Sequence, residues 1–462
     1  MDLEKKLAQL FIRIDALETE VISLKNKNAS LEKDKVVLQK RIDSLESKLH
    51  KKNSSNSSIP PSKDENRIKP NQSLRIKTNK KTGGQKGHRG TTLKMQDNVD
   101  RYVDHKSSFC SCCSERLRGE HTFTGRRQVI DIPPIQPTVT EHRIYSTVCS
   151  CGKTTTSTFP NDVTSPISYG STAMALTGYL SVGQYLPMKR IVEVFEHMFN
   201  IKLSQGTICN MLTKLTKQCM PAYLELRNRL ERSTVVGSDE TGCVVNGKKW
   251  WMWVWQNTRL TYIAASPSRG YQAILDNFPQ GFIYGTLLSD CWAAQLKTPS
   301  PDNQICLAHI QRELKYFIES DKNKWSKKLL NLIYTALSLR RKILSKPNKD
   351  FSKIIEKVQG ICSLLLRQIT AGPQKLQALK NRLLKHETSI WLFLDKLDVP
   401  PDNNGSERAI RNVKVKQKIS GQFRSATGAI QFAVLRSIYD TARKNNSPAY
   451  DAFIAVANFA PE

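Results

Sequence analysis

VVGSDETGCVV, residues 235–245, opens with two β-branched residues and runs directly into a pair of acids. β-Branched residues favour strands, so we predict a strand over 235–239. Asp239 then lies at the end of this strand.

Two further acids occur in related settings. FIYGTLLSDCW, residues 282–292, has the same shape and closes on Asp290. Glu407 lies far downstream in PPDNNGSERAIR (400–411), where it begins a very basic, helix-like segment. Two aspartates at strand ends and one glutamate on a helix suggest a site built from three carboxylates.

Such a site predicts a divalent metal. Carboxylates packed together repel one another and stay ionised only if positive charge lies between them. Mg²⁺, or Mn²⁺ in its place, suits hard oxygen ligands and leaves room for a substrate phosphate. Two such ions can stabilise both the entering and the leaving oxygen of a phosphodiester displacement. The alternative is that each acid is an ordinary loop or capping residue, since surface acids are common.

The acids lie in a region with mixed α/β patterning. Strands are predicted at 235–239, 249–256, 259–266 and 282–289, with a hairpin turn at 257–258 and a helix at 268–278. Three strands, a helix, a strand and then an acid is the order expected at the start of a ribonuclease H-like core. We predict that core over 234–310 and 396–430, interrupted by a helical insertion at 311–395 that is rich in Leu, Lys and Ile.

QICLAHIQREL, residues 304–314, predicts a short strand that runs into a helix. Cys306 and His309 have the Cys-x2-His spacing of a metal-binding pair. A half-buried cysteine and a histidine at a helix start would show the same spacing, and this interpretation is favoured.

The 462 residues carry 71 Lys and Arg against 41 Asp and Glu, a formal net charge of +30. This excess indicates a polyanionic partner, with nucleic acid as the best candidate. A polar, basic linker is predicted over 51–100. The candidate DNA-binding residues are the six cations after Glu407 and four in this linker: Arg408, Arg411, Lys414, Lys416, Lys418, Arg424, Lys80, Lys81, Lys86 and Arg89. A solvated basic face and a solvated linker are the alternatives.

Residues 1–50 repeat apolar side chains every seven positions. One heptad position is always leucine: Leu3, Leu10, Leu17, Leu24, Leu31, Leu38 and Leu45. The other holds Leu7, Ile14, Val21, Asn28, Lys35, Ile42 and Leu49. The pattern predicts a parallel coiled coil and hence a homodimer, with Asn28 fixing the register. A helix packed on the protein's own core is the alternative.

Two cysteine pairs predict a zinc-binding domain over 101–165. The ligands would be Cys110, Cys113, Cys149 and Cys151, with Cys112 as an extra thiol. A β-hairpin is predicted between the pairs at 126–148. Surface thiols without metal are the alternative.

Helices are predicted on both sides of the α/β region, over 166–233 and 431–462. In the first, residues 188–200 are periodic, and Ser204 is a plausible N-cap for the helix that follows. This arrangement is helix-turn-helix-like, although any two packed helices would look similar.

Together these motifs resemble the transposases of the insertion sequence 66 family, bacterial DNA transposases of the Asp-Asp-Glu class. The resemblance covers nearly the whole chain. It rests on the heptads, NSSNSSIPPSKD, GGQKGHRG, the cysteine finger with RQVIDIPP and TEHRIY inside it, SDET, WMWVW, SDCWAAQ, CLAHIQREL and PDNNGSERAIRNVKVKQKISGQFRSATGA. Similar Cys-x2-His elements in the cores of other transposase families imply an organising role for Cys306 and His309.

The resemblance implies that Asp239, Asp290 and Glu407 are the catalytic acids and bind two Mg²⁺ ions. Water would cut a strand at each element end, and the freed 3′-hydroxyl would attack target DNA. The zinc finger, helical domain and coiled coil would align two double-stranded DNA ends in a dimer. Accessory proteins of the same element remain an open option.

Two other functions fit the sequence. One is a DNA-binding regulator or inactive copy without catalysis; the other is a ribonuclease H-like nuclease for RNA–DNA hybrids. No signal peptide or membrane-length apolar run is found. We therefore expect a cytoplasmic, nucleoid-associated bacterial protein without a membrane partner.

Overall fold

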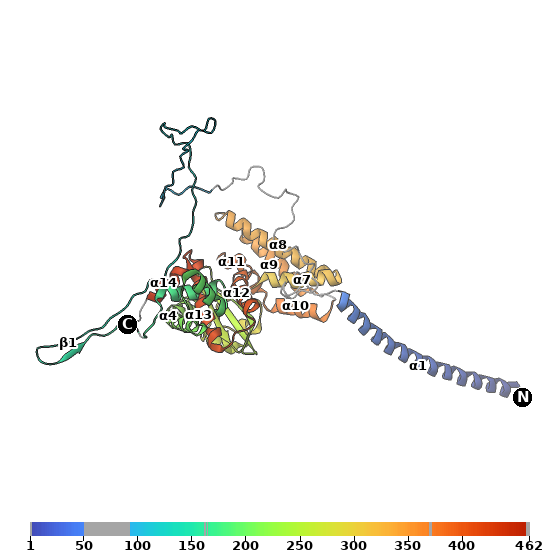
Figure 1. Ribbon diagram of the computed structural model, residues 1–462. Helices are drawn as coiled ribbons and strands as arrows, with labels where there is room; N and C mark the ends of the chain where they lie inside the picture. Colours follow the sequence, from blue (N-terminus) through green and yellow to red (C-terminus); the bar gives the residue numbers. More distant parts are fainter. Residues whose placement is uncertain (1, 50–92, 161–162, 164, 369–371, 459–462) are drawn as a thin grey trace.

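The computed structural model describes residues 2–49, 93–160, 163, 165–368 and 372–458 (Figure 1). Within α1, side chains are described for residues 13 and 17–39 only. The basic linker residues Lys80, Lys81, Lys86 and Arg89 lie outside the described residues.

A mixed five-stranded sheet forms the centre of the molecule. Its strands are β3 Val235–Val245, β4 Lys248–Gln256, β5 Thr261–Ser266, β6 Thr286–Ser289 and β7 Asp302–Ile305. The order is β5-β4-β3-β6-β7, with antiparallel pairing among β3, β4 and β5 and parallel pairing of β6 with β3 and β7. The strand β3 therefore joins an antiparallel half to a parallel half.

The strand β3 is longer than predicted. It continues past Asp239 to Val245 and turns into β4 through Asn246 and Gly247, whose φ angles are 46° and 72°. Two positive φ angles in a two-residue Asn-Gly turn are typical of a tight hairpin. Pairing with β4 holds the acidic stretch in the sheet, so Asp239 lies within a strand and not at its end. The predicted helix at 268–278 is also shorter, because α5 spans only Tyr271–Leu275.

Helices from both ends of the chain pack on this sheet. They are α2 Ser171–Gly178, η1 Tyr179–Gly183 (a π-helix), α3 Met188–Phe199, α4 Gln205–Glu231, α12 Asn404–Ser420, α13 Ala426–Lys444 and α14 Ala449–Asn458. Tyr223 on α4 donates a hydrogen bond to the Ile263 carbonyl at 2.8 Å, and Ser437 on α13 accepts one from the Ile263 N–H at 2.9 Å. The buried side chains of these helices and of the sheet form one core.

The break between α3 and α4 follows the predicted pattern. Asn200 ends α3 in the left-handed conformation, and Ser204 accepts a hydrogen bond from the Thr207 N–H at 3.0 Å. Ser204 is thus the N-cap of α4, as predicted.

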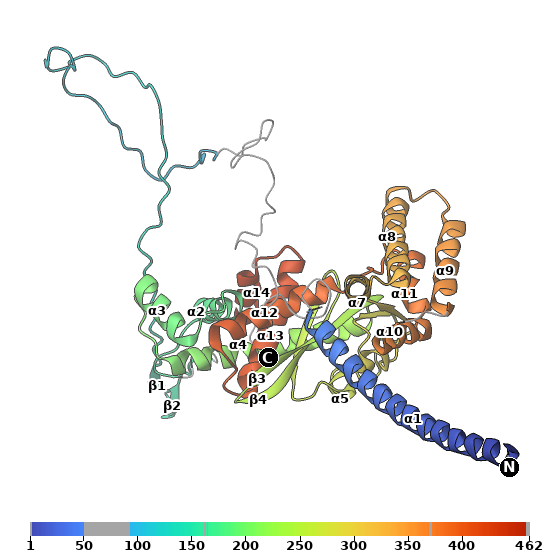
Figure 2. The same ribbon diagram turned by 90° about the vertical axis from the view of Figure 1, so that its right-hand side faces the viewer.

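A second group of helices lies between β7 and α12 in the sequence. They are α7 Leu307–Asp321, α8 Lys324–Ser345, α9 Ser352–Arg367, α10 Gln374–Lys385 and α11 Thr388–Asp395. Their buried side chains form a separate core. Figure 2 shows this group on the opposite side of the sheet from α2, α3 and α4.

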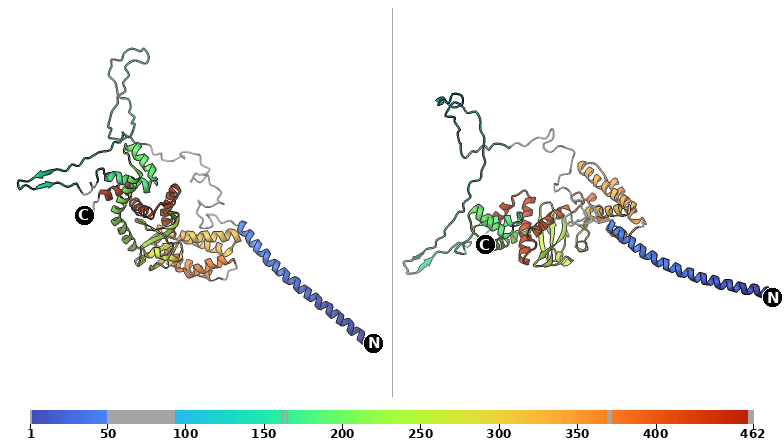
Figure 3. Two further views of the ribbon diagram at one scale, coloured as in Figure 1. Left: turned by 60° about the horizontal axis from the view of Figure 1, so that its bottom comes forward. Right: turned by 45° about the vertical axis from the view of Figure 1, so that its right-hand side comes forward.

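The described residues 2–49 and 93–160 contribute no described side chain to either core. The helix α1, Asp2–Leu49, projects away from the body of the molecule (Figure 3). The described heptad leucines of α1 are all exposed, from Leu17 to Leu38.

The predicted hairpin at 126–148 is wrong: the strands are β1 Ser146–Val148 and β2 Thr154–Thr156, so the second cysteine pair occupies the turn. Pro133, Pro134 and Pro137 remove backbone donors from the segment where the hairpin was expected.

None of the helices in the described parts of the chain is both long and apolar enough to cross a bilayer.

Candidate active site

Asp239 lies on the central strand β3, opposite Val254 of β4. The parallel register pairs Gly237 with Leu288 of β6, and continuing it by two residues brings Asp239 level with Asp290, just after β6 ends. Neighbouring strands lie roughly 4.8 Å apart. The two aspartates therefore meet at one edge of the parallel half of the sheet.

The helix α12 carries Glu407 in its first turn and packs closely on β3. A Cβ atom at Gly237 would lie 2.7 Å from both Gln256 Nε2 and Ser406 Oγ. Only glycine allows this approach. Asp239 is two residues further along β3, so its side chain leaves the same face of the strand and is directed toward α12.

The acids interact strongly. Burial raises the pKa of the Asp239 carboxyl well above its usual range, and the neighbouring Asp290 carboxylate raises it further. Glu240 and Glu407 act in the same direction. Burial also raises the pKa of Asp290, although the nearby His309 opposes the shift. This part of the molecule thus concentrates negative charge that a cation would stabilise.

Two side chains on α7 bridge the acids. Arg312 Nη2 lies 3.2 Å from Glu407 Oε1, and its Nη1 lies 3.1 Å from His309 Nε2. His309 Nδ1 in turn lies 3.3 Å from Asp290 Oδ1. The first turns of α7 therefore link Asp290 to Glu407, which lies 117 positions later in the sequence.

Asn403, fully buried just before α12, links the same elements. Its Nδ2 donates to the Ser238 carbonyl at 2.7 Å and lies 3.4 Å from Asp290 Oδ1. Its backbone N–H donates to Cys306 Sγ at 3.2 Å. These contacts connect β3, β6, α7 and α12 at one point.

A further acid borders the site. Glu240 Oε1 accepts from Arg269 Nε at 2.9 Å, and the Arg269 guanidinium lies over the rings of Trp251 and Trp292. Burial raises the pKa of Glu240, and the hydrogen bond from Arg269 lowers it. Because Glu240 is already paired with the Arg269 guanidinium, it is a less suitable metal ligand than Asp239.

The cations after Glu407 have different environments. Arg408, Arg411, Lys418 and Arg424 are exposed. Lys414 donates from Nζ to the Gly242 carbonyl at 2.8 Å, and burial lowers the pKa of Lys416. The exposed four are available to DNA, whereas Lys414 and Lys416 are packed against the core.

The four predicted zinc ligands form two local pairs. The backbone N–H groups of Cys113 and Cys112 lower the pKa of the Cys110 thiol. The Cys151 N–H does the same for the Cys149 thiol. In the described residues the two pairs do not converge into one ligand group. Figure 1 shows the β1–β2 hairpin extended away from the body.

Sequence reasoning missed Arg312 and Asn403. Cys306, His309 and Arg312 recur every third residue, a spacing that places them on one side of a helix start. Asn403 lies in an Asp-Asn-Asn run typical of a helix N-terminus. Both patterns were visible, but neither indicates which distant carboxylate the side chain contacts.

A carboxylate site on a mixed sheet, within a strongly basic chain, is typical of proteins that act on nucleic acid. Residues 167–431, more than half of the chain, match the family model described as "Transposase IS66 family". The protein is therefore a transposase by class, which confirms DNA as a partner.

Two further models match the N-terminal part. Residues 107–152 match the zinc-finger binding domain of transposase IS66, which supports a structural Zn²⁺. Residues 5–94 match a family of unknown function (DUF6444). The chain belongs to the IS66 family of transposases, and the resemblance inferred from the sequence is confirmed. No curated protein matches the chain.

Proposed function

We propose that the protein is a DNA transposase of the Asp-Asp-Glu class, which cuts DNA at the ends of an insertion sequence and joins them to target DNA. The chemistry would take place in a ribonuclease H-like core formed by 234–310 and 396–430. The observation that carries this proposal is the set of contacts that gathers the three acids: Asn403 joins β3 to Asp290, and His309 and Arg312 join Asp290 to Glu407.

The donor set fits Mg²⁺ or Mn²⁺. Three carboxylates offer hard oxygen ligands, and their mutual repulsion is the kind that a divalent cation removes. Two ions held by Asp239, Asp290 and Glu407 would stabilise charge on the entering and leaving oxygens of a phosphodiester.

The chain's own residues would keep these carboxylates in place. Asn403 donates toward Asp290, and Arg312 holds the Glu407 carboxylate from the α7 side. Carboxylate ligands held by a surrounding shell of hydrogen bonds need little reorganisation when substrate binds. Arg312 also brings a positive charge to where a DNA phosphate would approach.

A cleft on the other side of the α12 N-terminus supports DNA binding. It has a volume of about 1340 Å³, and its rim includes the exposed guanidinium groups of Arg232, Arg408 and Arg443. Asp398, Asp402 and Asp440 also line the cleft, and the Asp440 carboxylate is paired with Arg436 at 2.6 Å. The net positive charge of the rim suits a phosphate backbone.

The remaining segments would assemble the DNA complex. In the proposal, residues 1–50 form a coiled-coil homodimer and 51–100 a basic linker. Residues 101–165 bind zinc through Cys110, Cys113, Cys149 and Cys151, and 166–233 form a helix-turn-helix-like domain. The insertion 311–395 and the C-terminal helices in 431–462 complete the fold. A bacterial cytoplasmic location on the nucleoid and a role for accessory proteins belong to the same proposal.

The test is a cleavage and strand-joining assay on terminal-repeat DNA. The wild-type protein should cut and join these ends with Mg²⁺ and not without it. Asp239→Ala should be inactive yet shift the same DNA in a mobility assay. Wild-type protein that binds the ends but never cuts them would instead indicate a DNA-binding regulator.

A further inference from the structure

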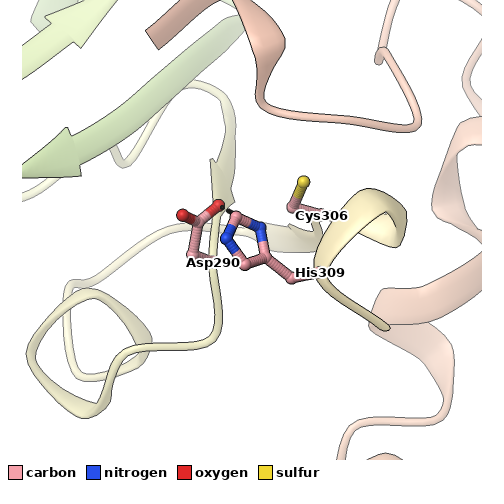
Figure 4. Close-up of side chains that lie close together, drawn as sticks. All are labelled: Asp290, Cys306 and His309. Carbon is pink, nitrogen blue, oxygen red and sulfur yellow. Dashed lines mark ion pairs between the residues drawn. The ribbon is translucent and has the colours of Figure 1, made fainter. Parts of the chain in front are cut away.

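Three different metal-binding side chains meet where the end of β6 faces the start of α7, one of them buried and two half-buried. Asp290, Cys306 and His309 each direct one ligand atom to a common place, and these atoms all lie within 4.8 Å of one another. Figure 4 shows the imidazole of His309 beside the Asp290 carboxylate, with the cysteine sulfur nearby. The proposed catalytic acids use only oxygen ligands, so this mixed group is chemically distinct from them.

Burial raises the pKa of the Cys306 thiol to about 12, so a bound cation would have to stabilise the thiolate. Cys306 is fully buried at the N-cap of α7. Its Sγ accepts the Asn403 N–H at 3.2 Å, and the N–H groups of Ala308 and His309 also face it. Donors around the sulfur stabilise negative charge on it and orient a thiolate ligand.

The histidine places its second ring nitrogen, Nδ1, at the same point. His309 Nδ1 is buried and has no hydrogen-bond partner within the described part of the chain. Asp290 Oδ1 is 3.3 Å away, but the contact does not have the alignment of a hydrogen bond. A buried polar atom without a partner is unfavourable, and a metal ion would satisfy it.

We propose that Asp290, Cys306 and His309 form a second metal site, selective for a borderline or soft divalent cation such as Zn²⁺. One sulfur, one nitrogen and one oxygen ligand suit tetrahedral zinc and leave its fourth position open. Ligand atoms 2.0–2.3 Å from zinc lie roughly 3.3–3.8 Å apart. The three side chains therefore need to close by only about 1 Å.

Arg312 opposes this site. The guanidinium can only donate, so Nε2 of His309 accepts its hydrogen bond at 3.1 Å. If a metal ion bound Nδ1, the imidazole proton would be on Nε2. The Nε2–H group would then face the N–H of Arg312, so two donors would meet. Arg312 must then turn away, and its charge also repels a cation. Arg312→Gln should therefore strengthen metal binding, because an amide oxygen can accept from Nε2–H.

The site would be inhibitory, a consequence that rests on the proposed function. Asp290 cannot hold zinc beside Cys306 and still complete the carboxylate set with Asp239. Zinc would thus compete with the catalytic use of Asp290 even when Mg²⁺ is abundant. Cation binding itself is independent of whether the protein cuts DNA.

The test uses the full chain with zinc already bound in its finger. Added Co²⁺ should produce visible absorption of a tetrahedral site and a sulfur-to-cobalt charge-transfer band. Cys306→Ser should lose the charge-transfer band and bind Co²⁺ at least about tenfold more weakly. The matched control is Cys362→Ser, which changes a buried cysteine of α9 and should keep the band. Arg312→Gln should bind several-fold more tightly than wild type.

Two results would overturn the proposal: a wild-type protein without a charge-transfer band, or a band that survives in Cys306→Ser. His309→Gln provides a second loss-of-ligand variant, and circular dichroism of every variant excludes misfolding.

In the cleavage assay, excess Zn²⁺ should inhibit wild type and Cys362→Ser but not Cys306→Ser. Equal inhibition of all three would refute the sharing of Asp290. A wild type that binds Co²⁺ but cuts no DNA would contradict the proposed function and leave the site supported.

Discussion

The acidic site and the cysteine finger are held together in different ways. The acids come from β3, β6 and α12, yet the protein's own buried contacts connect them, such as Asn403 Nδ2 to the Ser238 carbonyl at 2.7 Å. Each cysteine pair is ordered by its own tight turn, in which Ser114 N–H donates to Cys110 O and Gly152 N–H to Cys149 O. The packing of the core thus sets where the three proposed acids lie, whereas zinc would supply the long-range contact between the two cysteine pairs.

The largest effect is expected at the acids. Glu407→Gln should reduce Mg²⁺-dependent cleavage at least about 10²- to 10³-fold, because it removes one stabiliser of transition-state charge. Its zinc content and DNA affinity should match wild type, since neither involves this carboxylate. Single-turnover cleavage, metal analysis and mobility shifts measure the three quantities. Asp276→Asn, an exposed acid of the same core, is the control and should retain full activity.

Loss of a cysteine ligand in the finger should change the zinc content but not the stability of the sheet core. Cys113→Ser should weaken zinc binding by the finger and lower the zinc content by about one ion per chain, because a closed structural site needs all four thiolates. The sheet core should melt at the wild-type temperature, since the finger shares no buried cluster with it among the described residues. Metal analysis and thermal unfolding followed in the tryptophan region test this. A clear loss of core stability would show that the two regions are not independent.

Packing between β3 and α12 should have an intermediate effect. Gly237→Ala would place a methyl group against Gln256 and Ser406, and overpacking of this kind costs about 1–3 kcal/mol. The shift of α12 should also lower cleavage, because Glu407 moves with it. Gly242→Ala is the matched control on the same strand, since its nearest neighbour is a Trp251 ring atom at 3.7 Å. Urea unfolding of both variants gives the comparison, and equal stability would contradict close packing at Gly237.

The smallest effect is a pH-dependent change in stability. The Asp239 pKa is raised in the folded protein, so the native state binds more protons than the unfolded state between the ordinary pKa of 3.8 and the folded value. Stability therefore falls as pH rises through this window. Asp239→Asn cannot ionise and should melt at a higher temperature than wild type at pH 7 when the buffer lacks divalent cations.

That advantage should disappear as the pH falls below 3.8, where Asp239 is protonated in both the folded and the unfolded state. Asp276→Asn should show no such trend. An Asp239→Asn variant that is no more stable than wild type at pH 7 would mean that neither burial nor the neighbouring acids disfavours the ionised Asp239 carboxylate.

Local sequence patterns predicted which helices and strands are present better than they predicted where each one ends. The two valines that open β3, the apolar stretch of β6 and the capping serine at 204 are short-range features, and the structure has them. The end of β3 was misjudged because the acids looked like a boundary, while the Asn246–Gly247 turn marks the actual end. The hairpin near the finger was misplaced because the alternating residues at 126–148 lack a covering layer.

The site could be predicted only in part. The order of two strand acids and one helical acid follows from patterning. The bridge through Arg312 and Asn403 depends on how the insertion packs, and it joins residues about 95 to 165 positions apart. Such contacts have no local period in the sequence, so only the folded arrangement reveals them.

The most direct test of the central claim, that three distant segments form one metal-binding site, is cleavage of the protein itself by bound iron. Fe²⁺ in place of Mg²⁺, with ascorbate and peroxide, generates radicals that cut the backbone near the ion. We expect cuts near Asp239, Asp290 and Glu407 together, suppressed by excess Mg²⁺ and absent in Asp239→Ala. Cuts at only one of these segments, or a pattern unchanged by Mg²⁺, would contradict the account.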